Sequence, residues 1–300
     1  MIPLAAAVAG MSRVLVATRV TAWVRRWRNG AVVLSYHNVV PDGVPRGERT
    51  LHVARTRFRE QIERVAQRFR VVSIEELLLR LRDGRSLRGL AGVTFDDAYR
   101  GVLRHALPIL AEFGVPATIF VVAGALERSE PFWWDRLADS TGGIIPERER
   151  LLTELCGEEA RILAANPVPP SVGWDEDYLP ATGEQLANVD AAAVSLGLHT
   201  VTHPNLTRIT PERCAQELTA CWRVLCERFD RVLPAVAYPY GAVNGAVAAA
   251  AATQGLAGFG GATGLLSHRA SPPLLPRLYV GAGMSPDALE VAAAGLRFRR

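Results

Sequence analysis

The chain has 300 residues, 49% of them hydrophobic, and is therefore long enough to fold around a sizeable apolar core. All 34 basic residues are arginine, and the lack of lysine in the sequence excludes Schiff-base chemistry, a phosphate-loop lysine and a catalytic lysine base. The net charge of +4 is modest for this length, so we expect no nucleic-acid partner.

Residues 1–30 form a segment of their own in the sequence pattern. The first 41 residues carry five arginines and no acid, interleaved with apolar side chains such as Trp23 and Trp27. This predicts a basic amphipathic helix, which either contacts an anionic membrane surface or packs against the rest of the chain. No apolar run is long enough to span a membrane, and the charges follow the first apolar stretch instead of preceding it. We therefore expect a cytoplasmic protein or one bound peripherally at the inner membrane.

From residue 31 to residue 300, short apolar segments alternate with longer amphipathic ones. The expected strands are residues 31–36, 92–95, 117–122, 198–200, 235–238, 257–260 and 275–280. The expected helices are residues 56–70, 74–82, 99–113, 183–196, 211–229, 245–254 and 286–295. This alternation is typical of parallel strands joined by crossover helices, and it predicts a closed or nearly closed α/β barrel.

Residues 127–182 interrupt this rhythm. They contain six prolines and the aromatic cluster Phe132-Trp133-Trp134, followed by Trp174 and Tyr178. We expect a partly helical insertion on the barrel. Its aromatic side chains either stack on sugar rings or anchor the insertion to the barrel.

Four groups of polar residues follow predicted strands, at the end where parallel barrels place their catalytic groups. They are Tyr36-His37-Asn38, Asp96-Asp97, His199-Thr-Val-Thr-His203 and Tyr238-Pro-Tyr-Gly241. Two imidazoles and one carboxylate make a three-ligand set that leaves an open position, as a catalytic zinc site requires. One aspartate can bind the metal while its neighbour takes a proton from water, whose pKa a cation lowers. Alternatively, the aspartate pair caps the helix that is predicted to follow it.

The ordered set Thr94-Phe95-Asp96-Asp97, His199-Thr-Val-Thr-His203 and Tyr238-Pro239-Tyr240-Gly241 resembles the motifs of the polysaccharide deacetylase family, carbohydrate esterase family 4. The resemblance covers about residues 31–280. It implies a distorted (β/α)7 barrel that uses a divalent metal to remove N-acetyl groups from an amino-sugar glycan or glycolipid. Zn²⁺ is the expected metal, with Ni²⁺, Co²⁺ and Fe²⁺ as alternatives.

The resemblance also implies a role for individual residues. Asp96 would be the general base, and the metal ligands would be Asp97, His199 and His203. The backbone N–H of Tyr240 would help to stabilise the oxyanion.

The chain departs from the family pattern at three places. No arginine shortly precedes Pro239-Tyr240, and Arg277 is either a substitute that orients the base or an ordinary packing residue. The usual C-terminal histidine acid is missing; His37 resembles the acid of a family branch that acts on exported poly-N-acetylglucosamine. Ala98 stands where a glycine usually follows the aspartate pair.

Two other functions are compatible with this scaffold. One is a different amide or ester hydrolase that uses the same metal, and the other is a catalytically inactive glycan-binding module.

Overall fold

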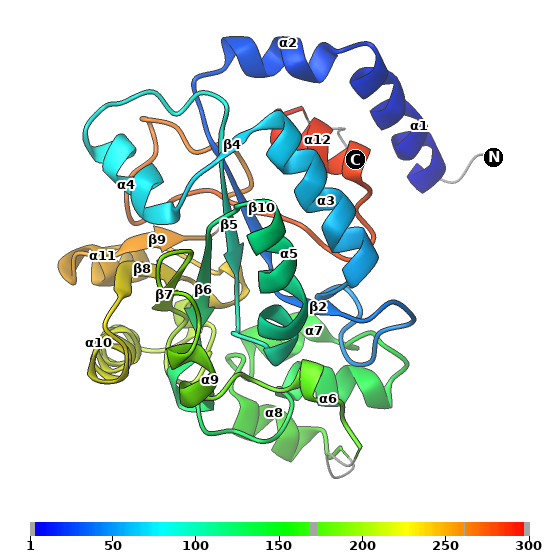
Figure 1. Cartoon of the computed structure of the whole chain (residues 1–300). Helices are drawn as coiled ribbons and strands as arrows, with labels where there is room; N and C mark the ends of the chain where they lie inside the picture. The colour runs from blue at the N-terminus through cyan, green and yellow to red at the C-terminus, as the bar shows by residue number, and fades with distance from the viewer. Residues whose placement is uncertain (1–3, 169–172, 261, 297–300) are drawn as a thin grey trace.

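The computed structural model describes residues 4–168, 173–260 and 262–296. Its main sheet contains seven parallel strands in the order β10-β1-β5-β6-β7-β8-β9, and it curls around a central axis (Figure 1). These strands are β1 (Val32–Tyr36), β5 (Leu90–Phe95), β6 (Ala117–Val121), β7 (Val194–Leu198), β8 (Val232–Ala237), β9 (Ala257–Phe259) and β10 (Leu278–Tyr279). The short β4 (Arg70–Val71) pairs with β5, and β2 (Asn38–Val40) pairs with β3 (His52–Ala54) in a separate sheet.

The last strand segment nearly closes the barrel. Leu275 forms an isolated parallel bridge with Phe259 of β9, and its N–H donates to the Gly258 carbonyl at 2.7 Å. Three residues later, Leu278 pairs with Leu34 of β1. The segment thus passes from one edge of the sheet to the other, and the predicted distorted α/β barrel is confirmed.

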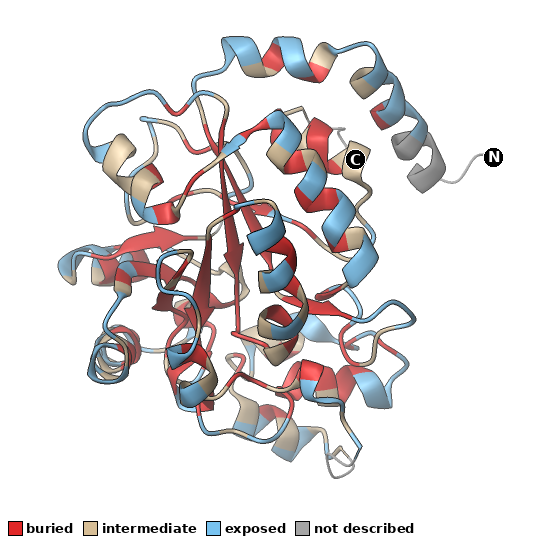
Figure 2. Ribbon diagram, in the orientation of Figure 1, coloured by how far each residue is buried: buried red, intermediate tan, exposed pale blue. Residues whose placement is uncertain are grey.

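Helices cover the outside of this sheet, and the strands are buried (Figure 2). Around the barrel lie α3 (Arg55–Arg68), the π-helix η1 (Val102–Ala106), α5 (Leu107–Glu112), α9 (Gly183–Ala187), α10 (Pro211–Arg228), α11 (Gly245–Thr253) and α12 (Pro286–Ala293), whereas α4 (Ile74–Arg82) packs against the barrel interior. The expected insertion contains α6 (Trp133–Ser140), α7 (Arg148–Thr153), α8 (Glu159–Ala165) and the 3-10 helix η3 (Glu176–Tyr178). Shorter 3-10 turns are η2 (Ala123–Ala125), η4 (Leu206–Arg208) and η5 (Pro239–Gly241).

The alternation of side chains along β5 decides which of them reach the barrel interior. Val93 and Phe95 belong to the core beneath the outer helices, whereas Gly92 and Thr94 face inward. A methyl group on Gly92 would lie 2.7 Å from Ile74 Cδ1, so α4 fills the barrel at the end where β5 begins. Asp96 continues the inward-facing set at the opposite, carboxyl end.

The helix predicted over residues 183–196 begins where expected but is nine residues too long, and the strand predicted at 198–200 begins four residues too late. Helix α9 ends at Ala187, and β7 begins at Val194. Between them Asp190 forms a turn in which its carbonyl accepts from Val194 N at 2.8 Å. The alanines before Val194 favour a helix locally, but they lie in this turn, where Ala192 N donates to Asp190 Oδ1 at 2.9 Å, and from Val194 onward pairing with β6 holds the chain extended.

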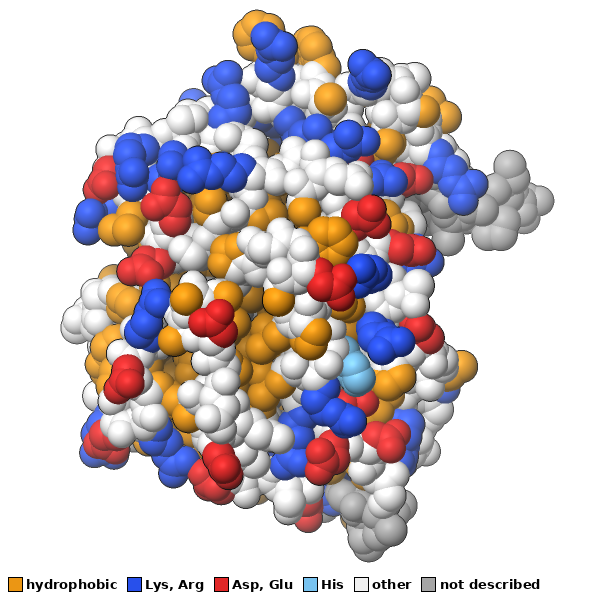
Figure 3. All heavy atoms as spheres, viewed as in Figure 1, with side chains coloured by type: hydrophobic (Ala, Val, Ile, Leu, Met, Phe, Trp, Pro, Cys, Tyr) orange, Lys and Arg blue, Asp and Glu red, His pale blue; other side chains and the backbone are white. Residues whose placement is uncertain are grey.

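The N-terminal segment forms two helices, α1 (Leu4–Ala17) and α2 (Val20–Trp27), where one helix was expected. Arg19 separates them with a left-handed φ of 57°. Helix α2 rests on α12, because Thr21 Oγ1 donates to Glu290 Oε1 at 2.7 Å. Arginine and apolar side chains lie together over α2 (Figure 3). Among the described residues, no helix combines the length and the apolar character that crossing a membrane requires.

Candidate metal centre and active site

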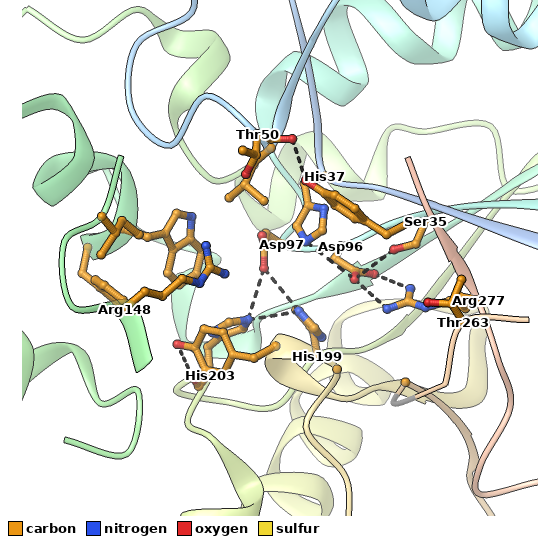
Figure 4. Close-up of a pocket in the computed structure, with 18 of the residues that line it drawn as sticks. Ser35, His37, Thr50, Asp96, Asp97, Arg148, His199, His203, Thr263 and Arg277 are labelled. Atoms are coloured by element: carbon orange, nitrogen blue, oxygen red, sulfur yellow. Dashed lines mark hydrogen bonds and ion pairs between the residues drawn. The ribbon is translucent and has the colours of Figure 1, made fainter. Parts of the chain in front are cut away.

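The two adjacent carboxylates at the end of β5 face the same pocket because the backbone turns between them (Figure 4). In a continuing strand, Asp96 and Asp97 would point to opposite faces. Instead, Asp97 and Ala98 adopt left-handed φ angles of 68° and 55°. The interpretation of the pair as a helix cap is wrong, because the next helix begins only at Val102 and its N-cap residue is Gly101.

Asp97, His199 and His203 form a buried triangle of potential ligand atoms. Asp97 Oδ1 lies 3.3 Å from His199 Nε2 and 3.4 Å from His203 Nε2, and the two Nε2 atoms are 3.1 Å apart. Tetrahedral ligands held about 2.1 Å from one cation are about 3.4 Å from each other. Asp97 Oδ1 is also buried without a hydrogen-bond partner among the described residues. The donor set therefore fits a divalent cation.

The protein prepares both imidazoles to act as ligands. His199 Nδ1 lies 2.6 Å from the Ala237 carbonyl, to which it donates, so Nε2 keeps its lone pair for the metal position. Burial and the neighbouring His199 lower the pKa of His203 to about 3, so His203 is a neutral ligand.

The segment between the two histidines is a strained loop held by a buried glutamate. The β-branched Thr200 and His203 itself both have left-handed backbones, with φ of 67° and 57°. Glu217 of α10 accepts hydrogen bonds from Val201 N at 2.8 Å and from Thr202 N at 2.9 Å. Glu217 was not predicted from the sequence, because only the packing of α10 against this loop reveals its role.

Asp96 is not part of this triangle of candidate ligands. It pairs with Arg277 instead. The two guanidinium nitrogens of Arg277 donate to Asp96 Oδ1 and Oδ2, each at 2.7 Å. Burial opposes a charge on Asp96, but Arg277 and His199 hold the pKa of Asp96 well below its usual range. Arg277 thus contacts Asp96 through both nitrogens, which the alternative of a residue that orients the base requires.

His37 approaches Asp96 from the end of β1. Its Nε2 lies 3.9 Å from Asp96 Oδ2, and its ring packs edge-on against Tyr279 at 5.6 Å. Burial lowers the pKa of His37, although Asp97 and Asp96 oppose this effect. The imidazole is therefore neutral at neutral pH.

Tyr240 lies beside His203 at the ligand triangle. Its backbone is left-handed, with φ of 60°, and its ring packs edge-on against His203 at 4.6 Å. The hydroxyl donates to the carbonyl of Gly157 or of His203, both 3.2 Å away. The backbone N–H of Tyr240 is in the first turn of η5, where a helix has no internal acceptor for its donors.

One cavity of about 370 Å³ brings all seven predicted site residues together. Other lining residues were not predicted for the site, and they include Ser35, Thr50, Trp133, Trp134, Arg148 and Tyr279. Trp133 and Trp134 are buried, and Trp134 Nε1 donates to Tyr99 OH at 2.7 Å. These two aromatics thus anchor the insertion to the barrel, which was one of the two alternatives expected from the sequence. They also form part of the pocket wall.

Fold and site together define a class: parallel α/β-barrel proteins with a buried Asp-His-His cluster suited to a divalent metal. The family model described as "Polysaccharide deacetylase" matches residues 84–259, more than half of the chain. The chain therefore belongs to the polysaccharide deacetylase family, whose members are hydrolases. The three motifs that resemble the family, at residues 94–97, 199–203 and 238–241, lie within the matched residues.

Solved structures show the same fold at low sequence identity. The deacetylase PplD from Streptococcus pyogenes, in complex with acetate, is 20% identical with a TM-score of 0.64, covering 88% of this chain and 98% of that one. IcaB from Ammonifex degensii is 24% identical with a TM-score of 0.61, covering 89% and 97%. A de-N-acetylase from Aggregatibacter actinomycetemcomitans is 16% identical with a TM-score of 0.61, covering 87% and 98%. The search of curated proteins found no match.

Proposed function

We propose that the protein is a metal-dependent hydrolase that removes N-acetyl groups from an amino-sugar glycan or glycolipid. One observation carries this proposal: the pocket joins the Asp97–His199–His203 triangle to a second carboxylate, Asp96, which Arg277 holds charged and apart from the triangle. A ligand set and a separate base are the two parts that metal-assisted amide hydrolysis requires.

Asp96 acts as the general base. A divalent cation in the triangle, when bound, supplies Lewis acidity that polarises the acetamide carbonyl and makes water more acidic. Asp96 takes the proton of the attacking water, and the bidentate pair with Arg277 fixes the direction from which it does so. The low pKa of Asp96 keeps the carboxylate free to accept that proton.

His37 returns a proton to the departing amine, which leaves poorly unless it is protonated. Because His37 is neutral at rest, its proton comes from Asp96, and since Nε2 and Oδ2 are 3.9 Å apart, one water molecule relays it between them. The amine then carries away the proton that Asp96 took from water, and both residues return to their starting states. The backbone N–H of Tyr240 donates to the oxyanion that forms at the carbonyl carbon.

Several features support acetylated sugar as the substrate. Family membership implies an acetylated polysaccharide. Two structural neighbours are described as a deacetylase in complex with acetate and as a de-N-acetylase.

The proposal is tested by measuring acetate release from N-acetylglucosamine oligomers, with the protein loaded in turn with Zn²⁺, Ni²⁺, Co²⁺ and Fe²⁺. We expect release that chelator abolishes and that added metal restores. Release from O-acetylated sugars alone would favour a different hydrolase on this scaffold. Glycan binding without turnover under any metal would indicate an inactive binding module.

A further inference from the structure

The outer face of α2 combines exposed tryptophan and arginine side chains. Trp23 and Trp27 are four residues apart and therefore lie on the same face of the helix. They are 66% and 68% exposed, which is unusual for the largest apolar side chain. Arg19 and Arg26 are exposed beside them.

The opposite face of α2 is fixed to the barrel, so the tryptophans cannot turn inward. Thr21 and Val24 are buried, and Thr21 Oγ1 donates to Glu290 Oε1 at 2.7 Å. Arg25 donates to the same oxygen at 3.3 Å, and its guanidinium lies 5.1 Å from the ring centroid of Phe69.

Glu290 is itself held by the domain, which makes this attachment rigid. Its other oxygen, Oε2, accepts from Arg64 at 3.1 Å and from Arg68 at 3.2 Å, both on α3. Glu290 on α12 thus joins α2, α3 and α12. The orientation of α2 is set by these contacts, and its outer face is presented to the surroundings.

The exposed apolar side chains of the protein concentrate in this segment. Eight large apolar side chains are exposed among the residues that the structure describes, and four of them are Met11, Val14, Trp23 and Trp27. The surrounding charge has one sign, because residues 1–41 carry five arginines and no acid. Over α2, Figure 3 shows blue and orange side chains together with no red between them.

We infer that this outer face, defined by Trp23, Trp27, Arg19 and Arg26, docks on an anionic lipid surface. Tryptophan prefers the boundary between water and acyl chains, and each nearby arginine is attracted by anionic headgroups. A neutral or cationic partner would not match the charge of the face. The inference goes beyond the proposed function and does not depend on it.

The fold also determines which way the catalytic pocket faces when the protein is docked. Helix α2 leads directly into β1 and lies where the barrel strands begin, whereas the insertion helices α6, α7 and α8 lie at the other end of the molecule (Figure 1). The pocket is lined by residues at the carboxyl ends of the strands and by the insertion. It therefore opens away from the bilayer.

Vesicle flotation with the full chain tests the inference. We expect co-flotation with phosphatidylcholine vesicles that contain phosphatidylglycerol, little flotation with phosphatidylcholine alone, and weaker binding at high salt. The double variants Trp23→Ala/Trp27→Ala and Arg19→Gln/Arg26→Gln should each bind at least about tenfold more weakly. Their substituted side chains are exposed, so we expect both variants to fold.

Two controls match these variants elsewhere on the surface. Val44→Ala/Ile144→Ala removes two other exposed apolar side chains, and Arg223→Gln/Arg228→Gln removes the same charge from α10. Both should float like the unmodified protein. Circular dichroism would show that all four variants retain the fold.

Quenching by brominated lipid tests the orientation. The other four tryptophans lie in the insertion and on α10, so quenching should disappear in Trp23→Phe/Trp27→Phe, which keeps two large apolar rings on the docking face. Persistent quenching in this variant would overturn the orientation. Flotation of Trp23→Ala/Trp27→Ala at wild-type level, or no flotation of the unmodified protein, would overturn the docking surface. A dimer in solution that dissociates in the tryptophan variant would assign this face to a second copy of the chain instead.

Discussion

Asp96 and Asp97 are adjacent in the chain but have different surroundings. The carboxylate of Asp97 faces two imidazoles, whereas that of Asp96 faces a guanidinium. This difference in partners gives the two aspartates separate roles under the proposed mechanism. One holds the cation, and the other moves the proton.

Asp96→Asn should lower deacetylation by about a thousandfold, because an amide cannot accept the proton of water. Metal content should stay at about one cation per chain, since the substitution leaves all three ligands of the triangle in place. Elemental analysis and acetate release measure the two quantities on the same sample. The exposed Asp83→Asn should change neither, and an active Asp96→Asn would show that the base is misassigned.

Ala98 occupies a backbone conformation that normally suits glycine. Its φ is 55° and its side chain is buried directly beside the site. A left-handed alanine costs about 1–2 kcal/mol, whereas glycine adopts this conformation freely. The family's glycine at this place therefore has a conformational reason.

Ala98→Gly should raise the free energy of unfolding by about 0.5–1 kcal/mol, because the strain that it relieves exceeds the added entropy of the unfolded chain. Urea unfolding of the metal-free protein measures the change. Ala249→Gly, on an exposed part of α11, is the matched control and should be destabilising by a similar amount. A loss of stability in Ala98→Gly would contradict this explanation.

At the scale of elements, the loop between β7 and η4 depends on α10, a helix that supplies none of the three candidate metal ligands. Glu217 of α10 accepts two backbone N–H groups and the Thr202 hydroxyl, the last at 2.5 Å. The loop is thereby kept in the left-handed conformation that brings His203 back towards His199. Residues that support metal ligands in this way set the geometry of the site.

Glu217→Ala should weaken metal binding by about 10–100-fold, because the loop loses the acceptor that holds it. Competition with a chromophoric chelator measures the affinity without any assay of activity. Glu217→Gln should retain most of the affinity, since one amide oxygen still accepts both N–H groups. Glu227→Ala, on the exposed side of α10, should behave like the unmodified protein; equal affinity in Glu217→Ala would refute the role of this glutamate.

The insertion acts as a second supporting element. Asp135 on α6 accepts from Tyr99 OH at 2.6 Å and lies 2.8 Å from His52 Nε2. Tyr99 in turn accepts from Trp134, whose ring centroid is 4.7 Å from that of His203. A buried polar network thus fixes the pocket wall relative to the metal triangle.

At the scale of the whole molecule, the proposed proton path joins segments that are far apart in the chain. His37 follows β1, Asp96 follows β5 and Arg277 precedes β10, and the barrel brings them together. The path makes His37 an acid that receives its proton during the reaction. An acid that had to be protonated beforehand would give a different pH dependence.

Acetate release should therefore not decrease between pH 6.5 and 8.5. Burial lowers the pKa of His37 below its ordinary value, so a pre-protonated acid would already lose activity as the pH rises through that lowered pKa. Transfer from Asp96 avoids this loss. A decrease centred below pH 7 in kcat/KM would show that His37 must carry its proton in the free enzyme.

The sequence determined the family, the alternation of strands and helices and the residues with metal-binding chemistry, because these are properties of motifs and local periodicity. It also placed those residues at strand ends, which the parallel topology then gathers at one end of the barrel. Most predicted strands and helices agree with the structure within a few residues. Local periodicity failed at residues 188–196, where a turn at Asp190 and the start of β7 override the preference of an alanine run for helix.

Only the tertiary structure decided how the groups of the site act on each other. It placed Arg277 on Asp96, 181 positions away, and Glu217 beneath the histidine loop. It also showed that a left-handed turn aims both aspartates into one pocket and that α2 turns its tryptophans outward. These features depend on contacts between distant segments and on individual backbone angles, which composition and periodicity do not specify.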